Sequence, residues 1–467
     1  MADGFKFTPS NPNNLANNYD VIIIGSGGAG LTSAIQAYEL GLNPVILEKM
    51  DKIGGNTTRA SSGMNAAETL VQLKHKVVDS FEDFYAETYK GGGEQNNQEL
   101  LKYFTEHSAL AIDWLSDHNI ELDDLTITGG MSKMRTHRPS SMAAIGGFLV
   151  TELLKQVALD NIPLFTNVKV DALLTDDDGV VTGVKATAND QEVVISGKAV
   201  VLATGGFGAG KDLLAKYRPD LDGLNTTNQP GATGDGIKLA TAVGAKLVDM
   251  DQVQVHPTVQ QDTDHAFLIG EAVRGEGAIL VNNEGQRFVN ELDTRKNVTA
   301  AIDGLGGTGA YLIFDRGIRN RAKAIEFYDS IGLVKTADSL PELAEVTGLT
   351  GNHLADTVAT WNQAVADHND ADFNRTTGMD RDIASGPFYS IHIAPAVHYT
   401  MGGVAINHKT EVQNESGQAI QGLYAAGEIV GGLHGNNRIG GNSIAETIIF
   451  GRQAGQQVFS YINEARN

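Results

Sequence analysis

Three glycines and one acid near the start of the chain have the types and spacing needed to bind a dinucleotide. The stretch VIIIGSGGAGLTSAIQAYELGLNPVILEK contains Gly25, Gly27 and Gly30 in a G-x-G-x-x-G pattern, with Glu48 about 20 residues further on. Glycines at these positions let the backbone approach a pyrophosphate. A helix beginning near Ala29 would direct its partial positive N-terminus at that group. Glu48 could then bind a pair of ribose hydroxyls.

The surrounding residues predict the elements that such a site requires. An apolar strand precedes the glycine turn, an apolar-periodic helix follows it, and a second apolar strand ends at the acid. The glycine pattern alone would be weak, because an ordinary strand–helix–strand unit can contain incidental glycines. Together, the pattern and its context favour an α/β fold with a Rossmann-like domain.

Composition limits the classes of function. The chain has 467 residues, of which 41% are hydrophobic, so more than one large core is expected. Its 57 acidic and 35 basic residues give a net charge of −22, which argues against a nucleic-acid partner. The absence of cysteine excludes disulfides, thiolate metal sites, iron–sulfur clusters and CxxCH haem attachment, and we predict no metal site. Electrons for any redox reaction must therefore come from outside the chain.

The N-terminal sequence predicts neither export nor membrane insertion. Residues 1–18, MADGFKFTPSNPNNLANN, resemble a flexible polar arm without the apolar core of a signal peptide. No later run approaches the ~20 apolar residues of a membrane-spanning helix. A cytoplasmic location is expected.

Changes in pattern along the chain indicate its organisation. Helical periodicity dominates 79–160, interrupted by a polar loop at 128–142, and a β-rich stretch with a DDDG turn follows. Residues 257–396 combine helices with acidic turns and contain no strand–glycine–helix unit, which indicates a separate inserted domain. Strand–turn–helix patterns return in 397–467, so the C-terminus is expected to complete the domain begun at 19–256.

Short motifs occur along the chain in a characteristic order. They are GSGGAG (25–30), GGNTTRASSGMNAA (54–67), ATGG (203–206), TGDG (233–236), HPT (256–258), EAVRGEGAILVN (271–282), RFVNELDTR (287–295), HYTMGG (398–403) and GNNRIGGNSIAET (435–447). In these motifs the chain resembles the flavoprotein family of fumarate reductase and succinate dehydrogenase. The resemblance implies FAD in the Rossmann-like domain, and an α+β capping domain whose closure forms the active site.

The resemblance also implies which residues contact FAD. They lie in the glycine turns, at strand ends and at the start of the last helix: Gly25, Gly27, Gly28, Ala29, Gly30, Glu48, Lys49, Gly55, Asn56, Thr57, Gly63, Met64, Asn65, Val168, Ala203, Thr204, Gly205, Asp235, Gly427, Glu428, Ser443 and Ile444. Asp235 could equally be structural.

The helix predicted to begin near Ser443 could serve the flavin. Capped by Asn442 or Ser443, it would direct its N-terminal amides at the flavin edge that becomes negative on reduction. Family members with covalent flavin carry a histidine in the loop corresponding to 56–63. This chain has NTTRASSG there, which predicts noncovalent FAD.

Three side chains are suited to holding a dicarboxylate. The fork of Arg438 can bind a carboxylate through two hydrogen bonds, and His398 adds a directed donor. His256 would serve the second carboxylate. By resemblance these residues bind the substrate, with the backbone of Gly63 and Gly441 closing around it. The alternative for each histidine is a purely structural role.

Arg295 is the candidate proton donor, with Glu271 and Arg274 as a relay that restores its proton. A carbanion developing beside a carboxylate is basic enough to take a proton even from a guanidinium within hydrogen-bond reach. Glu271 and Arg274 share a face if the segment is helical. The alternatives are a surface ion pair and an Arg295 that only binds a carboxylate.

These predictions converge on a FAD-dependent enzyme that reduces fumarate to succinate by hydride transfer from flavin N5 and protonation by an arginine. Gly270 stands where several fumarate reductases carry a hydroxyl that helps to hold a substrate carboxylate. Reduction of another 2-enoate, such as urocanate or an acrylate, therefore stays open. L-Aspartate oxidase and a non-catalytic flavin electron carrier are further alternatives. The expected partners are a small dicarboxylate and an external electron donor, namely reduced flavin, an NADH-linked reductase or a partner protein.

Overall fold

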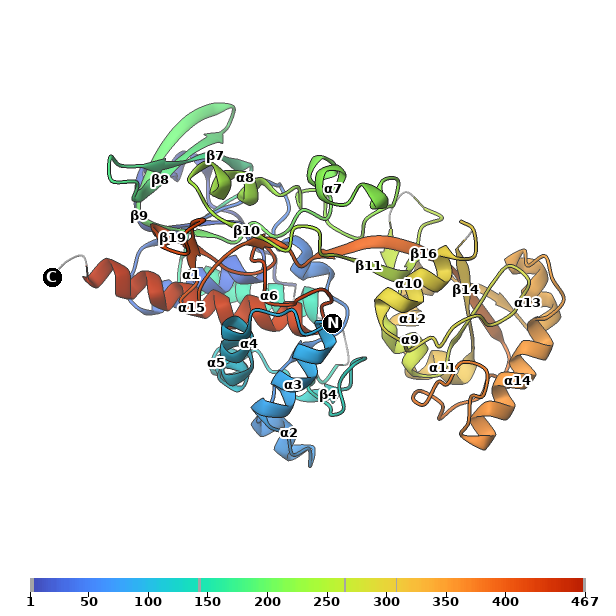
Figure 1. Ribbon diagram of the computed structural model, residues 1–467. Coiled ribbons are helices and arrows are strands. Elements are labelled where there is room, and N and C mark those ends of the chain that lie inside the picture. Colours follow the sequence, from blue (N-terminus) through green and yellow to red (C-terminus); the bar gives the residue numbers. More distant parts are fainter. Residues whose placement is uncertain (1–3, 142–143, 264–265, 308, 465–467) are drawn as a thin grey trace. The chain divides into compact units, whose positions relative to one another are not determined.

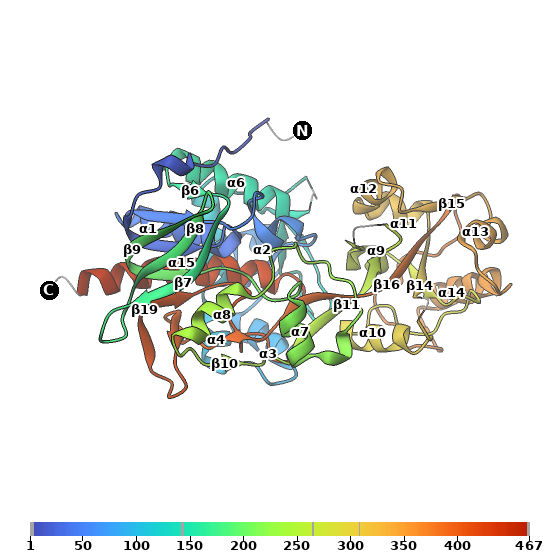
Figure 2. The same cartoon turned by 90° about the horizontal axis from the view of Figure 1, so that it is seen from above.

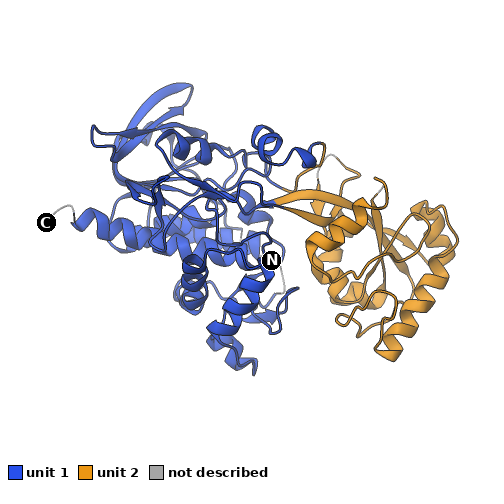
Figure 3. Ribbon diagram, in the orientation of Figure 1, with its two compact units in different colours: residues 1–222, 228–253, 399–467 blue, residues 223–227, 254–398 orange. Residues whose placement is uncertain are grey.

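The computed structural model describes residues 4–141, 144–263, 266–307 and 309–464. The first three residues of the predicted arm, Met142 of the predicted polar loop and the last three residues of the chain lie outside this description. The chain divides into two compact units (Figure 3). Unit 1 comprises Met1–Asp222, Asn228–Val253 and Tyr399–Asn467, and unit 2 comprises Gly223–Thr227 and Gln254–His398.

Unit 1 is built on a mostly parallel sheet with the strand order β18-β19-β9-β1-β2-β6. Strand β1 (Asn18–Ile24) is central, and Val21 lies opposite both Pro44 of β2 and Ala199 of β9. Its run of valine and isoleucine is buried, as expected for a parallel strand covered on both faces. The Rossmann-like prediction is confirmed. The other strands are β2 (Pro44–Leu47), β6 (Leu164–Phe165), β9 (Gln191–Leu202), β18 (Glu411–Gln413) and β19 (Ala419–Ala425).

Helix α1 (Gly28–Glu39) packs along the long C-terminal helix α15 (Asn442–Glu464), and the two views show these helices side by side (Figures 1 and 2). The approach is close because α15 presents glycines at the contact. A Cβ on Gly451 would lie 2.9 Å from Thr32 Cβ, and one on Gly455 would lie 2.9 Å from Gln36 Cβ. The Ser33 hydroxyl also donates to the carbonyl of Gly451 at 3.0 Å. The last segment of the chain is thus an integral part of the domain that its first segment begins.

The predicted β-rich stretch is confirmed as an antiparallel ribbon. Strands β7 (Val168–Thr175) and β8 (Val181–Ala188) pair with each other, and β8 pairs with β9. At the opposite edge of the sheet, Ser10 donates its amide to the carbonyl of Leu164 at 2.8 Å. Part of the segment expected to be a flexible arm therefore lies along β6.

The predicted helical insertion is also present, with one correction. Its helices are α2 (Leu70–Lys74), α3 (Phe81–Gly91), α4 (Gln98–Glu106), α5 (Ser108–Asp117) and α6 (Ile145–Leu159). The stretch expected to be only a polar loop contains β5 (Thr136–Arg138), which pairs with β3 (Met64–Asn65) and β4 (Asp124–Thr126). The charged residues in this stretch suggested an exposed loop. Arg135, directly before the strand, is instead fully buried, because Asp79 and Glu87 neutralise its charge, each at 2.6 Å.

Shorter elements complete unit 1. They are the 3₁₀ turns η1 (Pro12–Asn14), η2 (Gly55–Arg59) and η3 (Pro219–Leu221), the helices α7 (Lys211–Tyr217) and α8 (Asp235–Ala242), and the paired strands β10 (Leu247–Val248) and β17 (Gly403–Val404). None of the helices within the described ranges combines the length and apolar character needed to cross a membrane.

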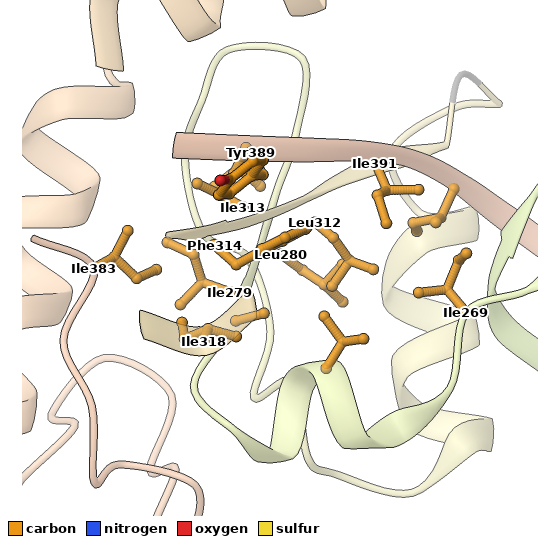
Figure 4. Packing of buried hydrophobic residues seen from close by; sticks show 14 of the residues in the cluster. Ile269, Ile279, Leu280, Leu312, Ile313, Phe314, Ile318, Ile383, Tyr389 and Ile391 are labelled. Carbon is orange, nitrogen blue, oxygen red and sulfur yellow. The ribbon is translucent and has the colours of Figure 1, made fainter. Parts of the chain in front are cut away.

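Unit 2 has its own sheet, with the order β12-β11-β16-β14-β13 and β15 paired to β16. Its strands are β11 (Val253–Gln260), β12 (Phe267–Leu268), β13 (Ile279–Val281), β14 (Ala310–Asp315), β15 (Lys335–Ala337) and β16 (Phe388–Thr400). The first residue of β11, Val253, and the last two of β16, Tyr399 and Thr400, belong to unit 1. Its helices are α9 (Glu271–Gly275), α10 (Arg295–Asp303), α11 (Arg316–Arg321), α12 (Ala324–Ser330), α13 (Leu340–Thr347) and α14 (Leu354–Asp367). Figure 4 shows its apolar core, in which Leu280, Leu312 and Ile391 of the sheet and Ile318 of α11 are fully buried.

A buried ionic cluster lies beside this core. Glu291 accepts hydrogen bonds from Arg287 at 2.8 Å and from Arg375 at 3.0 Å. Trp361 of α14 contacts both guanidiniums, whose carbon atoms lie 4.7 and 4.6 Å from its ring. Arg375 also donates to the backbone carbonyl of Arg274 at 2.6 Å. The cluster therefore fixes the backbone of the predicted relay residue.

Candidate active site

The glycine turn between β1 and α1 is packed too closely for a side chain at Gly25 or Gly30. Gly25 has a φ of +109°, and a Cβ there would lie 2.3 Å from the carbonyl oxygen of Ala203. A Cβ on Gly30 would lie 2.0 Å from the carbonyl oxygen of Gly25. The amide of Gly28 donates to the Thr57 hydroxyl at 2.9 Å, which attaches η2 to the turn. The tight turn at Gly25 and the close packing of the helix at Gly30 are what this type of dinucleotide site requires.

Glu48 lies directly after β2 and is 8% exposed. Its carboxylate accepts from the amide and hydroxyl of Ser26, at 3.1 and 2.6 Å, and from the amide of Met50 at 2.8 Å. The acid is thus held against the glycine turn. Lys49 and Asp235, both expected to contact the cofactor, bind each other at 2.8 Å.

Glu428 follows β19 and accepts from the backbone amide of Thr400 at 3.0 Å. Burial raises the pKa of its carboxyl to about 7. Asn56 of η2 donates to it at 3.5 Å and to the side-chain oxygen of Asn228 at 2.6 Å. The predicted cofactor residues Asn56 and Glu428 are therefore neighbours.

The remaining predicted cofactor residues occupy strand ends, turns and helix starts within unit 1. Gly27 and Ala29 lie in the glycine turn and α1, Gly55 in η2, Val168 at the start of β7, Ala203, Thr204 and Gly205 after β9, Gly427 after β19, and Ser443 and Ile444 in the first turn of α15. Strands β1, β2, β9 and β19 run parallel, so the segments that follow them gather at one edge of the sheet.

Strand β3 holds the loop that leads into α15. Asn65 donates to the carbonyl of Gly440 and to the side-chain oxygen of Asn442, both at 2.8 Å. A Cβ on Gly441 would lie 2.4 Å from Asn65 Oδ1. Met64 is fully buried, and a Cβ on Gly63 would lie 2.4 Å from the carbonyl oxygen of His137. Gly63 and Gly441 are therefore tightly packed backbone positions.

The predicted cap of α15 needs correction. The helix begins at Asn442, so both proposed capping residues lie inside its first turn. Asn442 is engaged by Asn65, and the Ser443 hydroxyl accepts from Arg438 Nη1 at 3.1 Å. Tertiary partners thus use the side chains that were expected to cap the helix.

The residues present fit FAD. The glycine turn lies at the N-terminus of α1, where a pyrophosphate binds in such folds, and Glu48 directly follows the next strand. Two buried polar atoms, Thr204 Oγ1 and Asn442 Nδ2, have no hydrogen-bond partner among the described residues. Such atoms are costly to bury unless a bound group satisfies them.

Arg438 is 4% exposed. Its guanidinium carbon lies 4.4 Å from the centre of the Tyr399 ring, and its Nη1 donates to Ser443. This predicted carboxylate ligand is thus fixed beside the first turn of α15.

Unit 2 brings the two predicted histidines together. The ring centres of His256 and His398 are 5.4 Å apart. His398 Nδ1 lies 2.7 Å from the Thr227 hydroxyl. His256 is fully buried, and its Nδ1 accepts from the amide of Thr258 at 3.3 Å. The neutral ring of His256 therefore carries its proton on Nε2, where it can act as a donor.

Unit 2 also brings together the predicted proton donor and its relay. Arg295, the first residue of α10, donates from Nε to Glu271 at 2.6 Å and from Nη1 to Gln254 at 3.0 Å. Glu271 and Arg274 both lie on the short helix α9. Arg274 is 2% exposed and donates from Nη1 to the carbonyl of Glu291 at 2.6 Å, so it is not a surface residue. Burial lowers the pKa of Arg274 to about 10.

Sequence reasoning missed the residues that orient these groups. Gln254 precedes His256 by two positions on β11, so strand alternation could have placed both on one face. Thr227 comes from a separate segment, and no local pattern indicates its contact with His398. Gly270 was identified as a departure, but its partner was not. Its amide donates to the hydroxyl of Tyr328 on α12 at 3.1 Å.

Comparison with known proteins identifies the family. A family model described as an FAD binding domain matches residues 20–444. The fumarate reductase (cytochrome) of Shewanella frigidimarina is 43% identical over 443 residues, which are 95% of this chain and 77% of that protein. The chain belongs to the fumarate reductase family of FAD-dependent flavoproteins. Membership confirms the predicted FAD cofactor and the oxidoreductase class.

Other members of the family differ in length and in substrate. An NADH:fumarate oxidoreductase of Klebsiella pneumoniae is 49% identical over 94% of this chain, which spans only 47% of that relative. A urocanate reductase of Eggerthella lenta is 33% identical over 96% of this chain and 76% of its own length. The solved open conformation of a flavocytochrome c3 fumarate reductase is 38% identical, with a TM-score of 0.83 over 96% of this chain and 79% of that one.

Proposed function

We propose that this chain reduces fumarate to succinate with two electrons from an external donor and two protons. The observation that carries the proposal is the hydrogen bond from Arg295 to Glu271, 2.6 Å long, on the unit that also holds the paired histidines. Similarity to fumarate reductases over at least 94% of the chain supports the same activity. Bound FAD would deliver a hydride to one carbon of the double bond.

The residues of the chain bind the substrate and supply the proton. Arg438 and His398 are proposed to bind one carboxylate through charge-assisted hydrogen bonds, and His256 to bind the other from Nε2. Withdrawing charge into both carboxylates makes the double bond a better hydride acceptor.

Arg295 is proposed to protonate the second carbon. Its Nε–H points at Glu271, whose carboxylate can return a proton after each turnover. Arg274 is proposed to extend this relay. Its pKa of about 10 means that it releases a proton more readily than an exposed arginine does.

FAD is proposed to be bound noncovalently, since the loop 56–63 contains no histidine that could form a bond to the flavin. Its holders are the glycine turn, Glu48, Asn56, Glu428 and the start of α15. The electron donor is proposed to be a reduced flavin, an NADH-linked reductase or a partner protein, and the location to be the cytoplasm.

Reduction of another 2-enoate is a second candidate, favoured by one observation. Gly270 offers no side chain, and its amide already donates to Tyr328. A urocanate reductase is similar to 96% of this chain over 76% of its own length. Substrate preference within the 2-enoates therefore depends on side chains other than that of residue 270.

A substrate panel tests the proposal. The FAD-loaded protein is reduced under anaerobic conditions and mixed with fumarate, urocanate or acrylate, while flavin reoxidation is followed by absorbance. Rapid reoxidation by fumarate, with succinate as the product, is expected. Faster reoxidation by urocanate or acrylate would reassign the substrate, and reoxidation by none would indicate an electron carrier.

A further inference from the structure

Within unit 1, Arg438 lies on the face of an aromatic ring. Its guanidinium carbon is 4.4 Å from the centre of the Tyr399 ring, and both residues are almost fully buried. A cation at this distance is attracted by the negative face of the ring, and burial strengthens the attraction. Tyr399 directly follows His398 in the chain, yet no property of the HYTMGG motif indicated a role for it.

The Tyr399 ring is itself anchored. Its hydroxyl donates to Glu446 Oε1 and lies 3.3 Å from His434 Nε2. His434 Nε2 lies 3.0 Å from the other oxygen of Glu446. Glu446 and His434 are each 2% exposed, so this hydrogen-bonded group has little access to water. Burial and the neighbouring Glu446 raise the pKa of Tyr399 well above its usual range, so its hydroxyl keeps its proton and remains a donor.

Helix α15 supplies a hydrogen-bond partner both for Arg438 and for Tyr399. Ser443, which accepts from Arg438, and Glu446, which accepts from Tyr399, are three residues apart in the first turns of the helix. Residues at this spacing lie on the same helix face. The face of the guanidinium is therefore fixed by Tyr399 and one edge by Ser443.

We propose that Tyr399 is a positioning residue for Arg438, with its ring fixing the plane of the guanidinium and Glu446 fixing the ring. This inference rests on the proposed function, in which Arg438 binds a substrate carboxylate. Stacking occupies the face of the guanidinium, whereas its N–H donors lie in the plane and point at the edge. An arginine whose plane is set in advance loses less conformational freedom when it binds a carboxylate.

The first test removes the ring from the FAD-loaded enzyme. Tyr399→Leu should lower kcat/KM for fumarate about 2- to 30-fold, the range for a partly to fully desolvated cation–π contact. The loss should appear mainly as a higher KM, because Arg295 and its partners are unchanged. Tyr399→Phe keeps the ring and removes only its anchor, so a smaller loss of about 2- to 10-fold is expected.

Tyr424→Leu is the matched control, since Tyr424 of β19 is also a buried tyrosine of unit 1, at 3% exposure against 5% for Tyr399. FAD content and KM of the control should match the parent. If Tyr399→Leu and Tyr424→Leu have the same KM, the positioning role is wrong.

Chemical rescue separates positioning from general packing. Arg438→Ala should regain part of its activity when free guanidinium is added, because the cation can occupy the vacated position on the ring. The double variant Arg438→Ala/Tyr399→Leu should need a higher guanidinium concentration for half-maximal rescue. Equal half-maximal concentrations, or rescue of neither variant, would contradict the inference. If Tyr399→Leu does not retain FAD, the same comparison with Tyr399→Phe decides the question.

Binding of malonate, followed through the flavin absorbance, separates this inference from the proposed function. If the parent reduces no enoate but Tyr399→Leu still binds malonate more weakly than Tyr424→Leu does, the proposed function is wrong and the positioning role stands. If the parent reduces fumarate and both variants bind malonate equally, the function stands and the positioning role is wrong. A parent that neither reduces an enoate nor binds malonate overturns both.

Discussion

Arg295→Lys should lower kcat for fumarate at least about 10²-fold, the lower end of the range for a lost general acid. The structure explains why this change is not conservative. Arg295 uses Nε for Glu271, at 2.6 Å, and Nη1 for Gln254, at 3.0 Å. A lysine ends in a single ammonium and cannot reproduce this fork. Loss of the charge-assisted bond to Glu271 alone is worth about 1.5–3 kcal/mol, and loss of the correctly placed proton adds to it.

The assay measures bound flavin, malonate affinity and steady-state fumarate reduction on one preparation. Flavin and malonate binding should stay close to the parent values, because Arg438, His398 and His256 are unchanged. Arg319→Lys is the matched control, since Arg319 forms a comparable ion pair in unit 2, at 2.6 Å from Asp329. If Arg295→Lys reduces fumarate within a few-fold of this control, another residue donates the proton and the mechanism is wrong.

Four further outcomes are expected. Arg438→Ala should weaken substrate binding as well as turnover, by about 1.5–3 kcal/mol in kcat/KM, and unchanged steady-state constants would exclude it from the site. His256→Ala should impair fumarate more than a monocarboxylic enoate, and equal losses on the two substrates would place the second carboxylate elsewhere. Acid precipitation should release FAD into the supernatant, whereas flavin retained in the pellet would show a covalent bond. Glu428 has a folded-state pKa of about 7 against an ordinary 4.5, so in flavin-free protein the Glu428 contribution to stability should be fully present below pH 4.5 and fall by about 3 kcal/mol as the pH rises from 4.5 through 7. Denaturant unfolding of Glu428→Gln should lack this component, and an identical pH dependence in parent and variant would show that the pKa is not raised.

The glycine turn and its strands could be predicted because each signal is local. Gly25 and Gly30 must be glycines to let backbone atoms approach, and the apolar run of β1 is typical of a strand buried on both faces. The histidines and arginines could be found because motifs surround them. Their roles stay predictions, although the structure places His256 beside His398 and Arg295 beside Glu271.

The parts that could not be predicted depend on tertiary contacts. Strand β5 follows a charged residue, Arg135, and a charged residue predicts an exposed position. In the structure Asp79 and Glu87 neutralise Arg135, which allows it to be buried. The cap expected for α15 failed for the same reason, since Asn442 and Ser443 are taken by partners far away in the sequence or outside the helix. A polar side chain can accept from a backbone amide of its own helix or from a distant side chain, and the sequence alone does not show which of these partners it binds.

Trp361, beside the ionic cluster of unit 2, is an intrinsic fluorescence probe of that unit. The chain has two tryptophans, and Trp114 belongs to unit 1 while Trp361 belongs to unit 2. Trp361 contacts the guanidiniums of both Arg287 and Arg375, so its emission should change when that cluster opens. In Trp114→Phe, tryptophan fluorescence would report on unit 2 alone, and the fluorescence of released FAD would report on unit 1. One denaturation experiment could then show whether the two units unfold together or one after the other.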